Sequence, residues 1–132
     1  MSSVQILVVD DEQIVAKSLQ IQLERLGYSV PVIASSGEEA IQKAVECQPD
    51  LVLMDIVLRG AMDGIEAARQ IRALRNVPVI FATAYADDDT FQRARTAGPA
   101  GYLCKPFGKE ELQRAIEIAL SGHIVAEVKA AR

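Results

Sequence analysis

The chain has 132 residues, the size of one ordinary domain, and half of them are hydrophobic, which is enough to bury a sheet. Its net charge is −4 and its pI about 5.0, which argues against direct nucleic-acid binding because that needs clustered Lys and Arg. The sequence shows no signal-peptide or membrane-spanning pattern, and its two cysteines make neither a metal-ligand spacing nor a disulfide framework. We therefore expect a cytoplasmic protein that does not contact membranes.

The N-terminal third of the chain predicts two strand–helix units. An apolar run over 4–9 predicts a strand, and apolar positions from Ile14 onward recur at helical spacing until Gly27 supplies a stop. A brief strand follows over 30–34. The next helix is expected to begin at Ser36, which precedes a glutamate by three residues, as in a capping box.

The remaining sequence predicts three more units of the same kind. Their helices begin near Asp63, span 87–97 and centre on 112–120, and the middle one of these is polar and only weakly amphipathic. Their strands are expected over 51–54, 78–82 and 101–104. A strand–helix order repeated five times predicts an α/β fold, with a parallel sheet, helices on both faces and right-handed crossovers.

The last residues of the sequence are expected to lie outside the domain. We expect one domain over 1–122 and assign 123–132 to a tail or to the start of a linker helix, two alternatives that the pattern leaves open. The single histidine, His123, falls in this segment and has no acidic neighbour in sequence.

Four of the predicted strands run directly into residues that can bind or accept a phosphoryl group. They are Asp10 and Asp11, Asp55, Thr83 and Lys105. In an open parallel sheet, ligands bind at the carboxyl ends of the strands, so these side chains are expected to converge. A carboxylate accepts a phosphoryl group only when the surrounding negative charge is neutralised, which Mg²⁺ and an ammonium group can do.

Each of these residues also has a plain structural explanation. Asp55 alone is consistent with a turn or a helix cap, Asp10 and Asp11 with an acidic first helical turn, Thr83 with a cap and Lys105 with a solvated loop. Taken together, these explanations require independent coincidences at one edge of one sheet. The functional interpretation is therefore favoured.

The ordered motifs resemble those of the receiver domain of a two-component response regulator. The resemblance covers roughly residues 4–121, nearly the whole chain. The motifs that carry it are ILVVDDE at 6–12, LMD at 53–55, MDG at 62–64, ATA at 82–84 and GYLCKPF at 101–107. The resemblance implies a flavodoxin-like (βα)5 three-layer sandwich with a five-stranded parallel sheet in the order 2-1-3-4-5.

The resemblance also implies a role for each acidic residue. Asp55 would take a phosphoryl group from a phosphohistidine on a sensor histidine kinase or a phosphotransfer protein. Asp11 and Asp55 would bind Mg²⁺ directly and Asp10 through water, and the backbone carbonyl of Val57 would complete the protein ligands.

Further residues match the family's switch. Thr83 and Lys105 would bind the phosphoryl group, and the peptide bond before Pro106 would be cis. Tyr102 matches an aromatic ring that turns inward as Thr83 moves, although static packing of the ring also explains it. The altered surface would be the fourth helix, last strand and fifth helix, facing an unknown downstream protein or output domain. Receivers of this type often pair through that surface, so a homodimer is an open alternative.

The sequence departs from the family pattern in the loop after Asp55. The segment 56–62 is one residue longer than usual and has no proline. Neither Val57 nor Tyr85 is a good partner for a hydrolytic water, so we predict a long-lived phosphorylated form. Cys104 should point away from its neighbours on the strand and is expected to be buried.

Two other classes of protein are weighed against the receiver. A Mg²⁺-dependent phosphohydrolase with an aspartyl-phosphate intermediate would need a second carboxylate close behind the nucleophile, where this chain has Val57. A flavin-binding electron carrier would need a phosphate loop after the first strand, where Asp10 and Asp11 would repel the phosphate. We therefore expect a phosphoacceptor with slow self-dephosphorylation at most, and not an enzyme.

Overall fold

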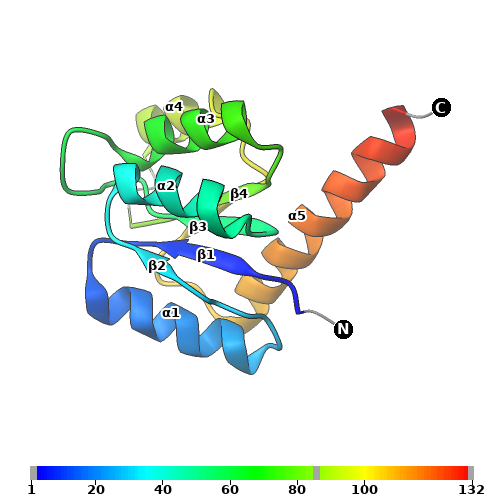
Figure 1. Ribbon diagram of the computed structural model, residues 1–132, viewed down its shortest axis with the longest axis horizontal. Helices are drawn as coiled ribbons and strands as arrows, with labels where there is room; N and C mark the ends of the chain where they lie inside the picture. Colours follow the sequence, from blue (N-terminus) through cyan, green and yellow to red (C-terminus); the bar gives the residue numbers. More distant parts are fainter. Residues whose placement is uncertain (1–2, 85–86, 131–132) are drawn as a thin grey trace.

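The computed structural model describes residues 3–84 and 87–130, the last nine of these by their backbone alone. Five strands form one parallel sheet in the order β2-β1-β3-β4-β5, which confirms the predicted flavodoxin-like topology (Figure 1). The strands are β1 (Ile6–Val9), β2 (Ile33–Ala34), β3 (Leu51–Met54), β4 (Val79–Thr83) and β5 (Gly101–Cys104). The helices are α1 (Gln13–Arg25), α2 (Gly37–Cys47), α3 (Gly64–Leu74), α4 (Asp88–Arg95) and α5 (Lys109–Ala130).

The sheet separates two hydrophobic cores, because alternate side chains of each strand point to opposite faces. On one face, Ile6 and Val8 pack with residues of α1 and α5. On the other, Leu7 and Val9 pack with residues of α2, α3 and α4. In Figure 1, α1 lies below the sheet and α2, α3 and α4 lie above it, while α5 starts low in the view and rises to the upper right.

Three of the helices begin at side-chain caps. The Ser36 hydroxyl accepts a hydrogen bond from the Glu39 amide at 3.1 Å, as the capping-box pattern predicts. Asp63 and Asp87 cap α3 and α4 in the same way. These caps orient α2, α3 and α4 with their N-terminal ends at the carboxyl edge of the sheet, where the candidate site lies.

Several sequence expectations differ from the structure at the periphery. Strand β2 has two residues instead of five, because only Ile33 and Ala34 are in register with β1. Ile14 was placed in the periodic apolar pattern of α1, yet its side chain is 86% exposed. Cys104 is exposed and not buried, because β5 is an edge strand and Leu103 is its only buried residue. Each error concerns a position with neighbours on one side only.

The last helix extends further than the sequence pattern indicates. Its backbone runs without a break from Lys109 to Ala130, beyond the predicted domain boundary at 122. The helix therefore continues into the segment assigned above to a tail or to the start of a linker helix; both alternatives and the boundary itself stay predictions. Within 3–84 and 87–130, no helix combines the length and apolar character needed to cross a membrane.

Candidate functional site

The register of the two central strands brings the acidic residues together. Val9 pairs with Met54 at the ends of β1 and β3, and the Asp55 amide donates a hydrogen bond to the Val9 carbonyl at 3.0 Å. Asp10 and Asp55 are the next residues along each strand, so their backbones lie side by side. The expected convergence at the carboxyl edge of the sheet is thus present.

The three carboxylates form a compact cluster. Asp10, Asp11 and Asp55 each offer one oxygen, and these oxygens all lie within 4.8 Å of one another. Oxygen ligands around Mg²⁺ lie about 2.9 to 4.2 Å apart, so small side-chain adjustments would let the three carboxylates hold one ion, directly or through a bound water. Asp10 and Asp55 are buried and Asp11 is partly exposed, which leaves one side of the cluster open to solvent. The donor set therefore fits Mg²⁺.

Lys105 supplies the positive charge of the site. Its Nζ donates to Asp10 Oδ2 at 2.8 Å and contacts Asp55 Oδ2 at 3.2 Å. The Lys105 amide also donates to the Thr83 carbonyl at 2.8 Å, which fixes the start of the loop after β5. The Lys105–Pro106 peptide bond is cis, as the resemblance implied.

Burial and charge shift the pKa values of the central pair. Burial raises the pKa of Asp55, with a further increase from Asp10, and these effects outweigh the attraction of Lys105 and a hydrogen bond from the backbone of Val57. Desolvation alone would lower the pKa of Lys105, but its contacts with Asp10 and Asp55 raise it above its usual value. Lys105 therefore stays charged at neutral pH.

The residues expected to respond to phosphorylation lie on the neighbouring strands. Thr83 ends β4 and is fully buried, and its partner in register is Cys104 of β5. Tyr102 is partly buried on β5. Its ring contacts Phe91 of α4 edge-to-face, with centroids 5.2 Å apart, and Phe81 with centroids 6.5 Å apart. Tyr102 thereby links the sheet core to α4.

Two further residues belong to the site, although the sequence analysis assigned them no role there. Gly64 faces the backbone of Asp55, because a Cβ atom at this position would lie 1.9 Å from the Asp55 carbonyl oxygen. Arg59, from the extended loop, places Nε 3.6 Å from Asp11 Oδ2 while its side chain is 84% exposed. The MDG motif is the only sequence pattern that points to Gly64. No sequence pattern points to Arg59, because it is a single arginine in a loop.

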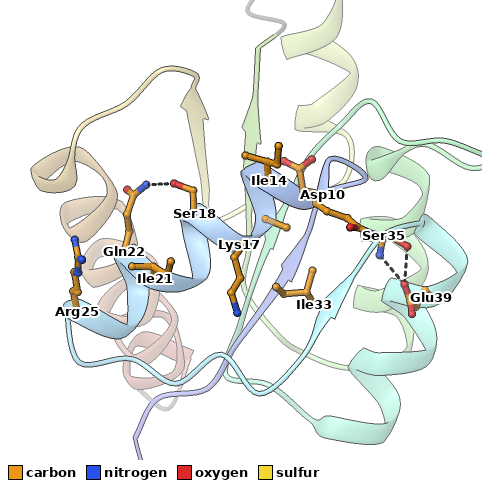
Figure 2. Close-up of a pocket in the computed structure, with 12 residues that line it drawn as sticks. Asp10, Ile14, Lys17, Ser18, Ile21, Gln22, Arg25, Ile33, Ser35 and Glu39 are labelled. Atoms are coloured by element: carbon orange, nitrogen blue, oxygen red, sulfur yellow. Dashed lines mark hydrogen bonds between the residues drawn. The ribbon is translucent and has the colours of Figure 1, made fainter.

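The rim of the site is apolar on two sides. The side chain of Val57 is about half exposed, two residues after Asp55. Ile14 projects from the first turn of α1, and a groove of about 940 Å³ continues from there along the helix. Figure 2 shows Ile14 beside Asp10 at one end of this groove and Arg25 at the other. Tyr85, the second residue tied to phosphoryl lifetime, lies outside the described residues.

Comparison with known proteins agrees with this geometry. The sequence model of the response regulator receiver domain matches residues 6–117. Among solved structures, the signal receiver domain of a modulated diguanylate cyclase from Desulfovibrio desulfuricans is 43% identical, with a TM-score of 0.87 over 92% of this chain and 97% of that one. A CheY-like receiver domain protein from Methanospirillum hungatei is 30% identical, with a TM-score of 0.87 over 95% and 99% of the two chains.

Curated relatives are longer proteins. The transcriptional regulatory protein PdtaR of Mycobacterium tuberculosis is 39% identical over 88% of this chain and 56% of its own length. The alkaline phosphatase synthesis transcriptional regulatory protein PhoP of Bacillus subtilis is 39% identical over 87% of this chain and 48% of its own. This chain therefore spans about half the length of such relatives. It belongs to the response regulator receiver domain family of two-component systems.

Proposed function

We propose that Asp55 accepts a phosphoryl group from a phosphohistidine on a sensor histidine kinase or a phosphotransfer protein. Asp10, Asp11, Asp55 and the Val57 carbonyl would hold the required Mg²⁺. One observation carries the proposal, namely the clustering of three carboxylates at the carboxyl edge of the sheet, two of which, Asp10 and Asp55, contact the ammonium group of Lys105. An acidic cluster alone would suit many roles; a lysine that contacts the acceptor carboxylate favours phosphoryl chemistry.

The proposed transfer makes one bond and breaks one. An Asp55 carboxylate oxygen bonds to phosphorus while the bond from phosphorus to the donor imidazole nitrogen breaks, and that electron pair stays on the nitrogen. Mg²⁺, when bound, neutralises charge on the phosphoryl oxygens. Lys105 already contacts Asp55, so its ammonium can bind one of these oxygens, and the Thr83 hydroxyl at the end of β4 can bind another.

The surroundings of the site support a protein as the phosphoryl donor. A donor that brings its phosphohistidine to Asp55 has to cover the rim, where Ile14, which lies beside Asp10 in Figure 2, exposes apolar surface. Val57, two residues after Asp55, exposes apolar surface as well. Burial of such side chains favours association. We expect Ile14→Asp to slow transfer from a donor protein at least tenfold, with transfer from a small acyl phosphate unchanged. Leu74→Asp, at the far end of α3, is the matched exposed control.

We further propose that the domain is a cytoplasmic switch and not a multi-turnover enzyme. The position that a phosphohydrolase would fill with a second carboxylate holds Val57, whose apolar side chain cannot act as a general acid or base. The same residue cannot orient water, which supports a slowly hydrolysed aspartyl phosphate. Phosphorylation would bias α4, β5 and α5, around Phe91, Tyr102 and Glu110, between two arrangements that a downstream protein, an output domain or a second copy distinguishes.

The direct test uses Asp55→Asn with a small acyl-phosphate donor and Mg²⁺. We expect the wild-type domain to gain the mass of one phosphoryl group and Asp55→Asn to gain none, with an unchanged circular dichroism spectrum. Asp89→Asn, which removes an exposed carboxylate from the first turn of α4, should be labelled like the wild type. Labelling of Asp55→Asn would refute the assignment of the acceptor.

A further inference from the structure

Helix α4 contacts the rest of the domain through Tyr102 and also through a second contact, at the N-terminus of α3. Arg93, on α4, donates through Nη2 to Asp63 Oδ2 at 2.5 Å, across thirty residues of sequence. Asp63 is the N-cap of α3, and its Oδ1 accepts from the Glu66 amide at 2.9 Å. Both oxygens of this carboxylate are therefore engaged, one within α3 and one by α4.

Asp63 is ionised in its contact with Arg93. Partial burial would raise its pKa, but hydrogen bonds from the Glu66 amide and from Arg93 outweigh that effect and lower it. The two side chains are partly exposed, 57% for Arg93 and 33% for Asp63, so solvent screens the attraction. The pair is thus an ionised contact of modest strength, which suits a contact that has to open.

Asp63 cannot move independently of Asp55. The next residue, Gly64, donates its amide hydrogen to the Ile56 carbonyl at 2.7 Å. Its α-carbon also lies so close to the acceptor backbone that a Cβ atom would overlap the Asp55 carbonyl oxygen. The N-terminus of α3 is therefore packed against the residue that receives the phosphoryl group.

Helix α4, in contrast, is lightly anchored. Ala94 is its only buried side chain within the described residues. Two arginines of α3 reach the turn that follows α4, where Arg69 donates to the Thr96 hydroxyl and Arg72 to the Gly98 carbonyl. Arg93 is the residue of α4 itself that contacts the cap of α3. Figure 1 shows α3 and α4 adjacent on the same face of the sheet.

We propose that the Arg93–Asp63 ion pair restrains α4 in the unphosphorylated domain and opens when phosphorylation moves this helix. The inference rests on the proposed function and specifies its regulation. Here Lys105 Nζ contacts the Asp55 carboxylate directly, an arrangement that a phosphoryl group on Asp55 would displace. Asp87, the N-cap of α4, follows Thr83 by four residues, so α4 is the helix next along the chain from the proposed Thr83–phosphoryl contact. By linkage, removing a contact made in only one of two states favours the other state.

The test compares Arg93→Gln and Asp63→Asn with Arg95→Gln. Asparagine keeps a capping oxygen and loses the charge, which preserves α3. Arg95 carries the same charge on the same helix, but among the residues that the structure describes its Nη1 donates to Gln92 of α4 itself and not to α3. Beryllofluoride with Mg²⁺ serves as a stable mimic of the phosphoryl group, and its apparent affinity is measured by NMR titration.

We expect both pair variants to bind beryllofluoride about two- to fivefold more tightly than the wild type, the range that a partly exposed ion pair supports. The double variant should gain no more than either single variant, and Arg95→Gln should match the wild type. Without ligand, backbone amides of 88–95 should exchange faster in Arg93→Gln than in Arg95→Gln.

Unchanged or weaker affinity in the pair variants would overturn the proposal, because the pair would then be equally present, or stronger, in the phosphorylated arrangement. A wild-type domain that neither binds beryllofluoride nor accepts a phosphoryl group would instead refute the proposed function and remove the basis for this inference. Normal wild-type binding together with unchanged variants would refute the inference alone.

Discussion

The centre of the sheet and its β5 edge are built differently. Every residue of β1, β3 and β4 is buried. At the edge, one of four residues of β5 and one of eight residues of α4 are buried. Asp10, Asp55 and Thr83 follow or end the buried strands, whereas Tyr102 and Phe91 belong to the edge. The candidate site is therefore held by fully buried strands, while the proposed signalling surface can shift at little cost in apolar burial.

The largest expected difference between the two regions appears when one aromatic ring is truncated in each. Phe81 is fully buried in β4 and Phe91 is 41% exposed on α4. We expect Phe81→Ala to lower the free energy of unfolding by about 4 kcal/mol, and Phe91→Ala by about 1 kcal/mol or less. Urea denaturation of both variants measures the difference. Equal losses would mean that the edge packs as tightly as the centre.

The next largest effect concerns the charge balance of the rigid centre. Lys105→Met keeps much of the side-chain volume but leaves Asp10 and Asp55 without their ammonium partner. We expect a loss of about 2 kcal/mol at pH 7, smaller than for a fully buried pair because Lys105 is partly exposed. The loss should shrink at low pH, as the carboxylates protonate, and on adding Mg²⁺. Lys109→Met, at an exposed position of α5, is the control.

A smaller effect follows from the raised pKa of Asp55. Because this pKa is higher in the fold than in the unfolded chain, the ionised carboxylate destabilises the fold, and this cost appears as pH rises through the folded pKa. Asp55→Asn should therefore be more stable than the wild type at pH 7. The gain should vanish below about pH 4, where both states protonate the carboxyl. Thermal unfolding across this pH range would detect a constant or inverted difference, either of which contradicts the prediction.

The smallest effect tests the exposed loop beside the site. Arg59 competes with a divalent cation for Asp11, so Arg59→Gln should bind Mg²⁺ about two- to threefold more tightly at low salt, with the gain lost at high salt. Isothermal titration calorimetry measures the affinity. Arg114→Gln, on α5 and away from the site, removes the same charge. An equal gain in Mg²⁺ affinity in this variant would mean that only the net charge of the domain matters.

Sequence alone determined the order of the elements and the identity of the site. Strands 51–54 and 101–104 were predicted with their observed bounds, because short apolar runs between turn residues specify buried strands. Asp10, Asp55 and Lys105 were found because parallel strands bring their carboxyl ends to one edge, so that strand order implies proximity.

The residues that hold the site in place and connect it to α4 could be identified only in the tertiary structure. Gly64 against the Asp55 carbonyl, Arg59 near Asp11 and the Arg93–Asp63 pair join segments whose separation along the chain carries no periodic signal. The exposure of Ile14 and Cys104 could likewise not be predicted from the sequence. Periodicity reports which side chains share a face, whereas burial depends on what the rest of the chain places against that face.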